Sequence, residues 1–526
     1  MSVFTQRLRA LTPSRLSGRR WLFVAYDQLH DGIGPLAREP AGELGIVLVE
    51  SAAKAARRPY HQQKLALVLA NQRHFALEQA NRGVAVRYVA SDQDHAAALA
   101  PLARELGPLR LQRPAERELR ATLAPLLANG SLVELPHEGW LTEPADFAAI
   151  PGPPWRMDAF YRQVRRRTGV LMARGKPLGG KFSFDTENRR PFRGEPVPPT
   201  PPEFAVDEVT AEVGALVRER FAQHPGQLHL AQLPARRADA ERLWHWAQQH
   251  CLPQFGPFED AFSVRSSGLF HTRLAPLLNL HRLLPKTVLD GVLALDLPLA
   301  SKEGFVRQLL GWREFVRHVH EATDGLRSLA GAPLDANQLR AAEPLPAAFW
   351  GQPSGLHCLD HVVADVWREA YSHHITRLMV LGNLATLLDV DPRQLTDWFW
   401  VAYADAYDWV VEPNVLAMAS FAVGELMTTK PYVAGSAYLQ RMGDACRECA
   451  FDPQRTCPIT RLYWQFLARH AERLAGNQRL AMPLRSAAKR SPSERDLDMR
   501  TLGWVQATLR AGAVLRPEEA PANPRR

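Results

Sequence analysis

The sequence WLFVAYDQL at residues 21–29 begins the region that decides the fold. Its first five residues, Trp21–Ala25, form a short apolar run, and similar runs recur with helix-length segments between them. The later runs are Ile46–Val49, Val84–Val89, Leu109–Gln112 and Ser131–Leu135. Short apolar strands that alternate with helices are typical of a parallel sheet with helices on both faces. The sequence therefore predicts an α/β domain over residues 21–140.

Polar residues follow the first predicted strand at the position where such sheets bind ligands. Asp27, Gln28 and Leu29 come directly after Trp21–Ala25, and parallel sheets bind ligands at the carboxyl ends of their strands. The region contains neither a G-x-G-x-x-G nor a G-x-x-x-x-G-K motif, so no dinucleotide or P-loop site is predicted. The clearest helix between the strands is His61–Arg82.

The segment 141–238 is rich in proline, and its last proline cluster is VPPTPP at residues 197–202. Proline cannot donate to a strand ladder, so we expect an ordered linker. The segment Tyr161–Thr168, YRQVRRRT, predicts one inserted basic helix. Its arginines suit a solvated face and a phosphate-contacting surface equally well.

Strand signals are missing from residues 239–482, and helical patterns follow one another. The predicted helices are Ala240–His250, Gly304–His320, Leu359–Leu388, Pro392–Val411, Val415–Thr428 and Ile459–Leu474. Asp391 and Pro392 form a helix start with a capping acid and a first-turn proline. We expect a large all-helical domain here, followed by a basic tail at residues 483–526 with one helix, Leu497–Ala511.

Composition excludes several classes of protein. The chain has 526 residues, of which 46% are hydrophobic and 23% charged, so it is not disordered as a whole. No apolar run approaches the roughly 20 residues that span a bilayer, and five cysteines do not make a secreted disulfide scaffold. Residues 1–20 hold five arginines and no acid. That composition occurs in some organelle leaders, but we expect a frayed basic arm. The net charge of +9 indicates a polyanionic partner.

Four cysteines have a spacing that suits metal ligands: Cys358, Cys446, Cys449 and Cys457. A close C-x-x-C pair with outlying cysteines fits tetrahedral zinc or a four-iron cluster. Zinc sites more often use two such pairs, and a proline after the last cysteine is common beside iron–sulfur ligands. Spacing alone leaves the cluster, zinc and ordinary buried thiols open. Cys251 has no nearby partner and is predicted to be a packed thiol.

Three further segments carry polar groups without a specific motif. His373 and His374 are adjacent on a predicted helix, so their side chains point about 100° apart. Residues 403–414 contain three carboxylates and an amide, which could hold a cofactor or cap a helix. Residues 307–315 combine arginine and tryptophan, as ordinary packed helices also do.

Taken together, these segments resemble the photolyase/cryptochrome superfamily, and within it the bacterial iron–sulfur branch of prokaryotic (6-4) photolyases and cryptochrome-like proteins. The motifs that carry the resemblance are EGFVRQLLGWRE at 303–314, YSHHITRLMV at 371–380, VEPNV at 411–415, GGKFSFDTENR at 179–189 and the four cysteines. The resemblance extends from about residue 21 to 474. It implies an α/β antenna domain in front of an all-helical domain that holds FAD.

The resemblance assigns cofactor ligands residue by residue. It implies a 4Fe-4S cluster on Cys358, Cys446, Cys449 and Cys457. It also implies FAD contacts from His271, Thr272, Gln308, Trp312, Arg313, Arg377, Asp408 and Asn414. Among these, Arg377 and Asp408 match an Arg–Asp pair over the flavin ring, and Asn414 matches a polar group near flavin N5. Ala275 and Leu277 depart from the common Ser-Pro-Tyr form of the phosphate segment.

The same resemblance implies the catalytic and electron-transfer residues. His374 matches a position that faces both flavin and lesion, with His373 assisting. Repair of a (6-4) lesion needs a proton as well as an electron, and imidazole exchanges protons near neutrality. The remaining matches are Tyr432 and Tyr438 near the lesion, and Trp398 and Trp350 as electron donors. Phe399 stands where some relatives have tyrosine.

In the front domain, Asp27, Gln28, Leu29 and Glu50 resemble an antenna motif. Family members bind 6,7-dimethyl-8-ribityllumazine there. Tyr26 stands where glycine would be expected.

These observations predict light-dependent repair of (6-4) photoproducts in UV-damaged DNA by a cytoplasmic monomer, nucleoid-associated when bound to DNA. A cryptochrome-like photoreceptor that signals through a partner is the alternative. A light-independent iron–sulfur DNA enzyme would share the cysteines and the positive charge but would carry no flavin. The sequence offers that third class no glycosylase or carboxylate–metal site.

Overall fold

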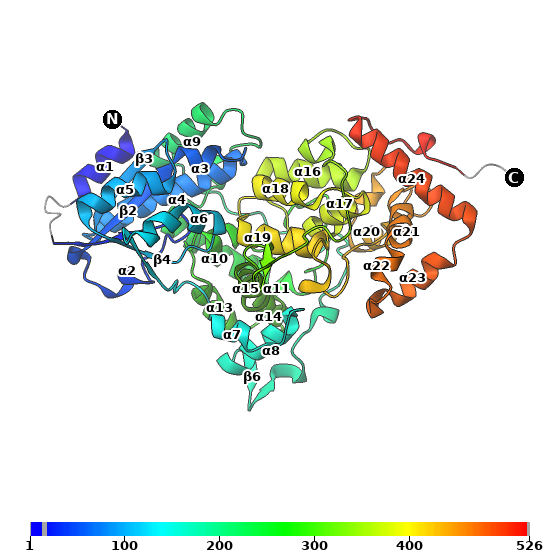
Figure 1. Cartoon of the computed structure of the whole chain (residues 1–526), viewed down its shortest axis with the longest axis horizontal. Helices are drawn as coiled ribbons and strands as arrows, with labels where there is room; N and C mark the ends of the chain where they lie inside the picture. Colours follow the sequence, from blue (N-terminus) through cyan, green and yellow to red (C-terminus); the bar gives the residue numbers. More distant parts are fainter. Residues whose placement is uncertain (1, 13–17, 523–526) are drawn as a thin grey trace.

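The computed structural model describes residues 2–12 and 18–522 and shows an α/β region beside a larger helical region (Figure 1). The strands are β1 Arg20–Phe23, β2 Leu44–Ser51, β3 Ala85–Ser91, β4 Leu109–Gln112, β5 Leu132–Leu135, β6 Met172–Ala173, β7 Lys176–Pro177, β8 Ser328–Leu329 and β9 Ala332–Pro333. The α-helices up to the end of the linker are α1 Val3–Leu11, α2 Pro35–Arg38, α3 Ala52–Ala56, α4 Gln62–Asn81, α5 His95–Leu106, α6 Arg117–Ala128, α7 Pro144–Ala148, α8 Met157–Thr168 and α9 Glu208–Arg220.

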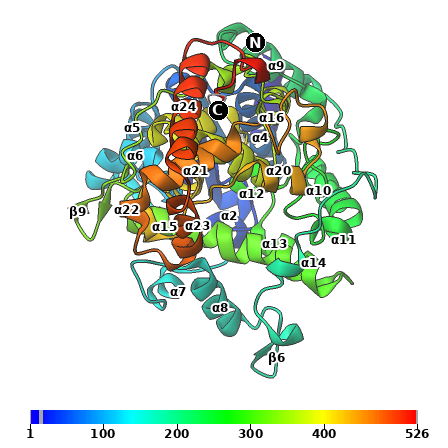
Figure 2. The same cartoon turned by 90° about the vertical axis from the view of Figure 1, so that its right-hand side faces the viewer.

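The helical region is built from many short helices. They are α10 Arg237–Trp246, α11 Leu252–Phe255, α12 Ala275–Asn279, α13 Pro285–Ala294, α14 Leu299–Val306, α15 Glu314–Ala322, α16 His357–Glu369, α17 Asn383–Leu387, α18 Pro392–Ala402, α19 Asp408–Val411, α20 Ser436–Met442, α21 Ile459–Arg469, α22 Ala471–Leu474, α23 Ala481–Ala488 and α24 Pro492–Arg510. The long α24 packs along α21 at the end of the molecule away from the sheet (Figure 2). No helix in the described part of the chain is long and apolar enough to cross a membrane.

A five-stranded parallel sheet in the order β3-β2-β1-β4-β5 forms the centre of the α/β region. All five predicted strands are present, with ends that shift by one or two residues. In the register, Leu22 pairs with Ile46, and Val47 pairs with Arg87. Every residue of β2 is buried, because helices cover both faces of a parallel sheet. The predicted fold class is confirmed.

The first helix corrects one expectation. Residues 3–11 of the predicted frayed arm form α1, which packs on α4 and α9. Phe4 and Leu8 are buried in the core between these helices and the sheet, and Ser2 caps the helix by accepting from the Thr5 N–H. Two apolar side chains four residues apart therefore fix the segment despite its arginines. Residues 13–17 of the same predicted arm lie outside the described residues.

The linker contains the predicted basic helix, α8, below the main body of the molecule (Figure 1). One of its arginines has a structural role. The Arg165 guanidinium is buried and donates to the carbonyl oxygens of Val170, Leu171 and Phe182. The neighbouring Arg166 and Arg167 stay exposed, so only part of the basic run faces solvent.

One predicted helix is broken at a position that matters for the site. The sequence predicts a single helix over Leu359–Leu388, but α16 ends at Glu369 because Ala370 adopts a left-handed conformation with φ 51°. Helical structure resumes with the π-helical segment Thr376–Gly382. The predicted helix 392–411 likewise splits into α18 and α19. At its start Asp391 accepts hydrogen bonds from the Arg393 and Gln394 N–H groups, which confirms the predicted cap.

The α/β region docks directly on the helical region. The ammonium of Lys64, on α4, is buried and donates to the carbonyl oxygens of Trp400, at 2.8 Å, and Ala406, at 2.5 Å. A buried ammonium with two fixed acceptors holds the two regions in one orientation. The Asp27 carbonyl oxygen, after β1, lies 2.6 Å from His281 Nδ1, and α6, after β4, contacts α19, so the carboxyl ends of β1 and β4 face the helical region.

Candidate functional site

The four predicted metal ligands meet in one cavity of about 310 Å³. Cys358 lies on the first turn of α16, Cys446 and Cys449 follow α20, and Cys457 precedes α21. Burial, followed by the three neighbouring thiols, raises the pKa of Cys358 well above its usual value. Convergence of all four side chains argues against ordinary separate thiols and fits a four-thiolate metal site. Cys251 lies apart, where its thiol donates to the His271 carbonyl oxygen at 3.7 Å.

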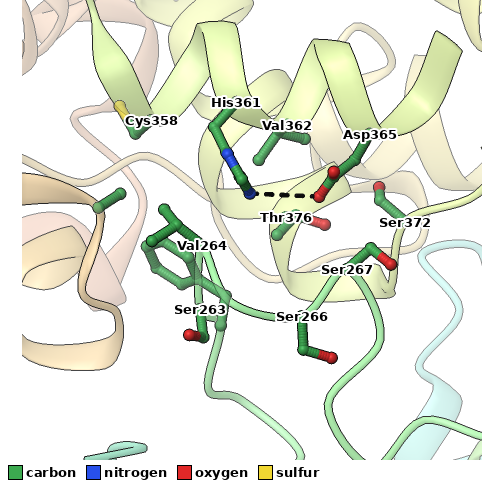
Figure 3. Close-up of a pocket in the computed structure, with 12 residues that line it drawn as sticks. Ser263, Val264, Ser266, Ser267, Cys358, His361, Val362, Asp365, Ser372 and Thr376 are labelled. Atoms are coloured by element: carbon green, nitrogen blue, oxygen red, sulfur yellow. Dashed lines mark ion pairs between the residues drawn. The ribbon is translucent and has the colours of Figure 1, made fainter. Parts of the chain in front are cut away.

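A second cavity of about 300 Å³ adjoins the first and shares Cys358 with it (Figure 3). Hydroxyl groups dominate its polar lining: Ser263, Ser266, Ser267, Ser372 and Thr376. His361 and Asp365 form an ion pair at 3.4 Å across one side, and the hydrogen bond to Asp365 raises the pKa of His361. The cavity connects the cysteines to the start of the segment that carries Arg377.

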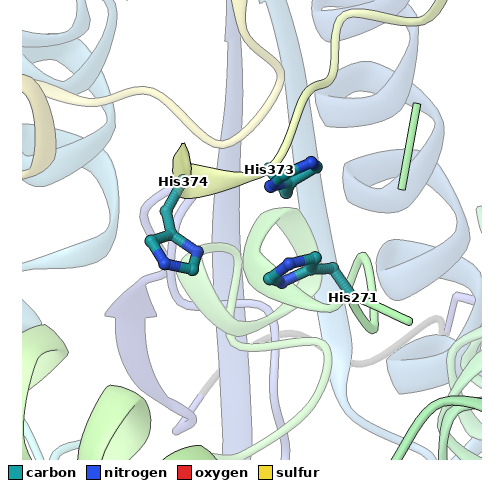
Figure 4. A group of neighbouring side chains, drawn as sticks. All are labelled: His271, His373 and His374. Atoms are coloured by element: carbon teal, nitrogen blue, oxygen red, sulfur yellow. The ribbon is translucent and has the colours of Figure 1, made fainter. Parts of the chain in front are cut away.

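Three histidines form a compact group beside this segment (Figure 4). The His271 and His373 rings stack at 4.4 Å with an angle of 5°, and His374 meets His271 edge-on at 5.2 Å. Burial lowers the pKa of both His271 and His373 well below the usual value, so these two rings are neutral. His373 lies in the break after α16, and its ring is buried. His374 begins the helical segment that follows, and its side chain is 42% exposed.

His374 lies close to an acid, Asp260, that no sequence motif marks. Its Nε2 atom lies 3.7 Å from Asp260 Oδ1, and Asp260 Oδ2 lies 3.6 Å from Arg189 Nε. Burial raises the pKa of Tyr438 to about 12; the charge of Asp260 adds to the rise, and that of Arg189 opposes it. The charge of Arg189 likewise opposes the rise that burial causes in the pKa of Tyr432. The predicted residues His374, Tyr432 and Tyr438 thus border one exposed region, with Asp260 and Arg189 between them.

The predicted Arg377–Asp408 pair is wrong. Arg377 forms a bidentate pair with Asp405, at 3.0 Å for both bonds, and its guanidinium stacks on Tyr403 at 4.0 Å. Asp408 instead accepts from the Glu118 N–H at 2.9 Å. The reason is local: α18 ends at Ala402, the following turn presents Asp405, and Asp408 begins α19 on the side of the α/β region.

We expect the two aspartates to differ sharply when each is changed to asparagine. Asp405→Asn leaves the Arg377 guanidinium without its anion and lowers the free energy of unfolding by ~3 kcal/mol. Burial raises the pKa of Asp408, so a neutral amide is tolerated there and Asp408→Asn changes stability by less than ~1 kcal/mol. Denaturant unfolding of both variants measures the difference. An equal or larger loss in Asp408→Asn would contradict the observed pairing.

The other predicted FAD contacts fall into separate places. Thr272 is buried next to His271, and the Gln308 amide donates to Glu259 at 2.6 Å. Arg313 is enclosed between Trp140, at 4.3 Å, and Trp409, at 5.4 Å. The remaining two also have local roles: Trp312 packs edge-on against Phe315, and Asn414 donates to the Val410 carbonyl oxygen within its own helix. Thr272 and Arg377 therefore lie beside the histidines, whereas Arg313 and Asp408 lie toward the α/β region.

A third tryptophan stands between the two predicted electron donors. Trp350 is 46% exposed and stacks on Trp367 at 5.6 Å, and Trp367 meets the buried Trp398 edge-on at 5.9 Å. The indole N–H groups of Trp367 and Trp398 both donate to the Phe349 carbonyl oxygen at 2.9 Å. Sequence reasoning missed Trp367, since a tryptophan on an amphipathic helix carries no signal beyond packing.

The predicted antenna residues separate into two groups. Asp27, Gln28 and Leu29 are buried after β1, where the Gln28 amide donates to the Gln112 carbonyl oxygen. Glu50 points to a different environment, with a bidentate pair to Arg73 at 3.0 and 3.1 Å and a hydrogen bond from Tyr88. Glu50 thus has side-chain partners of its own beside α9, and its part in antenna binding stays a prediction.

Asp27 adjoins several buried polar atoms without partners. Asp27 Oδ1, Tyr407 Oη and His281 Nε2 are all buried, and none has a hydrogen-bond partner in the described residues. His281 Nδ1 lies 2.6 Å from the Asp27 carbonyl oxygen, which places the two residues together. Unpaired buried polar atoms are rare, so the group is suited to a polar ligand between β1 and the helical region.

Asp27 also makes stability depend on pH. Burial raises its pKa to about 7 from the usual 3.8. Because the folded state binds this proton more tightly, the stabilisation is complete below pH 4 and is lost as pH rises through 7. We expect Asp27→Asn to melt at a higher temperature than the parent at pH 8 and at the same temperature near pH 4. A parent protein that melts higher at both pH values would contradict the assignment.

Comparisons with known proteins extend over most of the chain. A family model described as "Deoxyribodipyrimidine photo-lyase-related protein" matches residues 22–232. The (6-4) photolyase of Agrobacterium fabrum is 35% identical over 498 residues, or 90% of this chain and 96% of that protein.

Solved structures share the fold at lower identity. A bacterial class III photolyase from Agrobacterium tumefaciens has a TM-score of 0.55 at 15% identity, covering 94% of this chain and 99% of its own. A cryptochrome from Synechocystis has a TM-score of 0.50 at 16% identity, covering 77% and 83% of the two chains. At these identities the likeness concerns the fold alone.

Proposed function

Because the chain belongs to the photolyase/cryptochrome family, we propose that it uses light to repair (6-4) pyrimidine–pyrimidone photoproducts in UV-damaged DNA. The observation that carries the proposal is the position of His374. Its side chain is 42% exposed, packs against a buried histidine and faces Asp260 at 3.7 Å. An imidazole held between neutral rings and a carboxylate, at an accessible surface, suits proton transfer to a bound lesion.

The residues around Arg377 fit a flavin. His373 is buried, and neither of its ring nitrogens has a hydrogen-bond partner in the described residues. Arg377 and Asp405 offer a paired cation and anion beside it. We propose that His271, His373, Arg377 and Asp405 hold FAD, with the hydroxyl-lined cavity of Figure 3 next to them. Reduced FAD, when bound and excited by light, supplies one electron to the lesion and takes it back.

The chain's own residues handle the proton and the DNA. Asp260 lies 3.7 Å from His374 Nε2 and orients the ring, so His374 is placed to give a proton to the group that moves between the two bases. Tyr432 and Tyr438 border the same region and are neutral phenols that can donate hydrogen bonds, since burial raises the pKa of both. The exposed arginines of α8 add positive charge for the phosphate backbone.

The four-cysteine cavity fits a 4Fe-4S cluster, which we propose as its occupant. Four thiols from α16 and from the loops beside α20 and α21 supply the complete ligand set that such clusters use. We likewise propose that 6,7-dimethyl-8-ribityllumazine binds at Asp27, where the unpartnered atoms of Asp27, Tyr407 and His281 gather. Trp350, Trp367 and Trp398 connect the surface to the interior and are proposed as the route for flavin photoreduction.

Repair of a defined oligonucleotide tests the function directly. We expect the purified holoprotein to restore a (6-4) lesion to two pyrimidines under blue light and to leave it unchanged in the dark. An anaerobic absorption spectrum and an iron assay of the same sample should show flavin bands and about four irons per chain. A flavin-loaded protein that reduces its flavin in light yet repairs no lesion would favour a photoreceptor instead.

A further inference from the structure

Two cations beside the proposed lesion site have no anionic partner. Lys430 lies in the loop before α20, and Arg479 lies on the turn between α22 and α23. Burial raises the pKa of Tyr432, and the positive charges of Arg479 and Arg189 oppose that rise. Within residues 2–12 and 18–522, neither Lys430 nor Arg479 forms an ion pair with a carboxylate.

A buried amide holds the two cation-bearing segments together. Asn477 is 5% exposed, and its side-chain N–H groups donate to the Thr429 carbonyl oxygen and to Glu425, both at 2.8 Å. Its side-chain oxygen accepts from the Arg479 N–H at 3.0 Å. One side chain therefore ties the residue before Lys430 to the backbone of Arg479, so the two cation-bearing segments stay close together.

The positive charges of Lys430 and Arg479 repel each other, and a bound anion would offset this repulsion. Burial lowers the pKa of Lys430, and the positive charges of Arg479 and Arg189 lower it further, in keeping with the link between the two segments through Asn477. Arg189 is itself balanced by ion pairs with Asp185 and Asp260. Lys430 and Arg479 are thus the uncompensated pair, and a site built to keep two cations together is stabilised by a doubly contacted oxyanion.

We propose that Lys430 and Arg479 bind a phosphodiester of the damaged DNA strand, next to the bases that turn into the lesion site. The inference rests on the proposed function, because that function brings a DNA strand to this surface. A lesion that turns out of the duplex carries its flanking phosphates to the rim of the pocket. The rim position fits: His374 lies 3.7 Å from Asp260, Asp260 lies 3.6 Å from Arg189, and the charges of Arg189 and Arg479 both act on Tyr432, two residues after Lys430.

Such a contact positions the strand and does not read its sequence. It therefore contributes to binding of any damaged strand equally, and its contribution falls with salt. Each phosphate that is neutralised on a duplex adds about −0.9 to the slope of log K against log salt concentration. The arginine can bond two phosphate oxygens while the lysine acts as a point charge.

The test uses the holoprotein and a duplex with one (6-4) lesion. We expect the double variant K430Q/R479Q to bind it about tenfold more weakly at low salt, with a salt slope less steep by about 0.9. Lys286→Gln is the matched control, since Lys286 is 75% exposed on α13 and pairs only with Asp290. Unchanged thermal midpoints show that the variants fold. An unchanged salt slope in the double variant overturns the proposal.

A neutral phosphate analogue locates the contact. A methylphosphonate placed beside the lesion should weaken binding of the parent but add no further loss in K430Q/R479Q. If the methylphosphonate weakens binding of K430Q/R479Q as much as it weakens binding of the parent at every position tested, the assignment to a lesion-flanking phosphate is overturned. If the parent binds lesion and undamaged DNA equally and repairs no lesion, the proposed function is wrong. The phosphate site is then supported if the salt dependence of binding to undamaged DNA is less steep in the double variant than in the parent, and is overturned if the two slopes are equal.

Discussion

Replacing His374 with alanine is expected to reduce repair of (6-4) lesions by at least about 10²-fold while FAD remains bound. The ring packs on His271 and faces Asp260 at 3.7 Å, so its removal deletes the proposed proton donor but no part of the Arg377–Asp405 pair. Blue-light repair of a lesion oligonucleotide, with the flavin content measured on the same sample, separates the two effects.

A matched control makes this result specific. His245→Ala changes an exposed histidine on α10 and should repair normally. Asp260→Asn removes the carboxylate that lies 3.7 Å from His374 Nε2, so repair should fall while flavin stays bound. Normal repair by the His374→Ala variant would overturn the proton-donor role. Normal repair by Asp260→Asn would show that Asp260 does not position the His374 ring.

The parts of this molecule that sequence predicted well are those with a strong local pattern. The five strands of the sheet are continuous apolar runs buried on both faces, and β2 shows this most clearly. The spacing of the four cysteines predicted that they meet, because a C-x-x-C pair with outlying cysteines is typical of a metal site, and all four line one cavity. Asp391 and Pro392 predict the start of α18 because their capping contacts involve only the next three residues.

The errors arise where a partner is set by tertiary structure. Asp405 and Asp408 differ by three residues, and only the end of α18 at Ala402 decides which of them meets Arg377. The partners of Glu50, Arg73 and Tyr88, are likewise set by the packing of α4 and β3 against β2. The break at Ala370 is similarly invisible, since alanine favours helix and its left-handed conformation is imposed by the chain around it. That break is what places His373 and His374 in different surroundings.

Loss of one cysteine ligand is expected to have the second large effect. Cys358→Ser should lose nearly all bound iron and lower the unfolding midpoint by on the order of 5 °C. The reason lies in the positions of the ligands: Cys358 belongs to α16, whereas the other three lie on the loops that flank α20 and α21. A bound cluster therefore joins segments about 90 residues apart in the sequence. Iron analysis and thermal unfolding of the anaerobically purified variant measure both changes.

The same variant tests whether the cluster supports the lesion site from a distance. Tyr438 lies on α20, directly before the loop that carries Cys446 and Cys449, and the charges of Asp260 and Arg189 act on its hydroxyl. If the cluster anchors α20, Cys358→Ser should weaken binding of lesion DNA while leaving flavin bound. Cys251→Ser is the control, because its thiol contacts the His271 carbonyl oxygen outside the cavity and it should keep its iron. Full iron content in Cys358→Ser would overturn the ligand assignment. Loss of iron with unchanged lesion binding would show that the cluster stabilises α16 and its neighbours but does not support the lesion site.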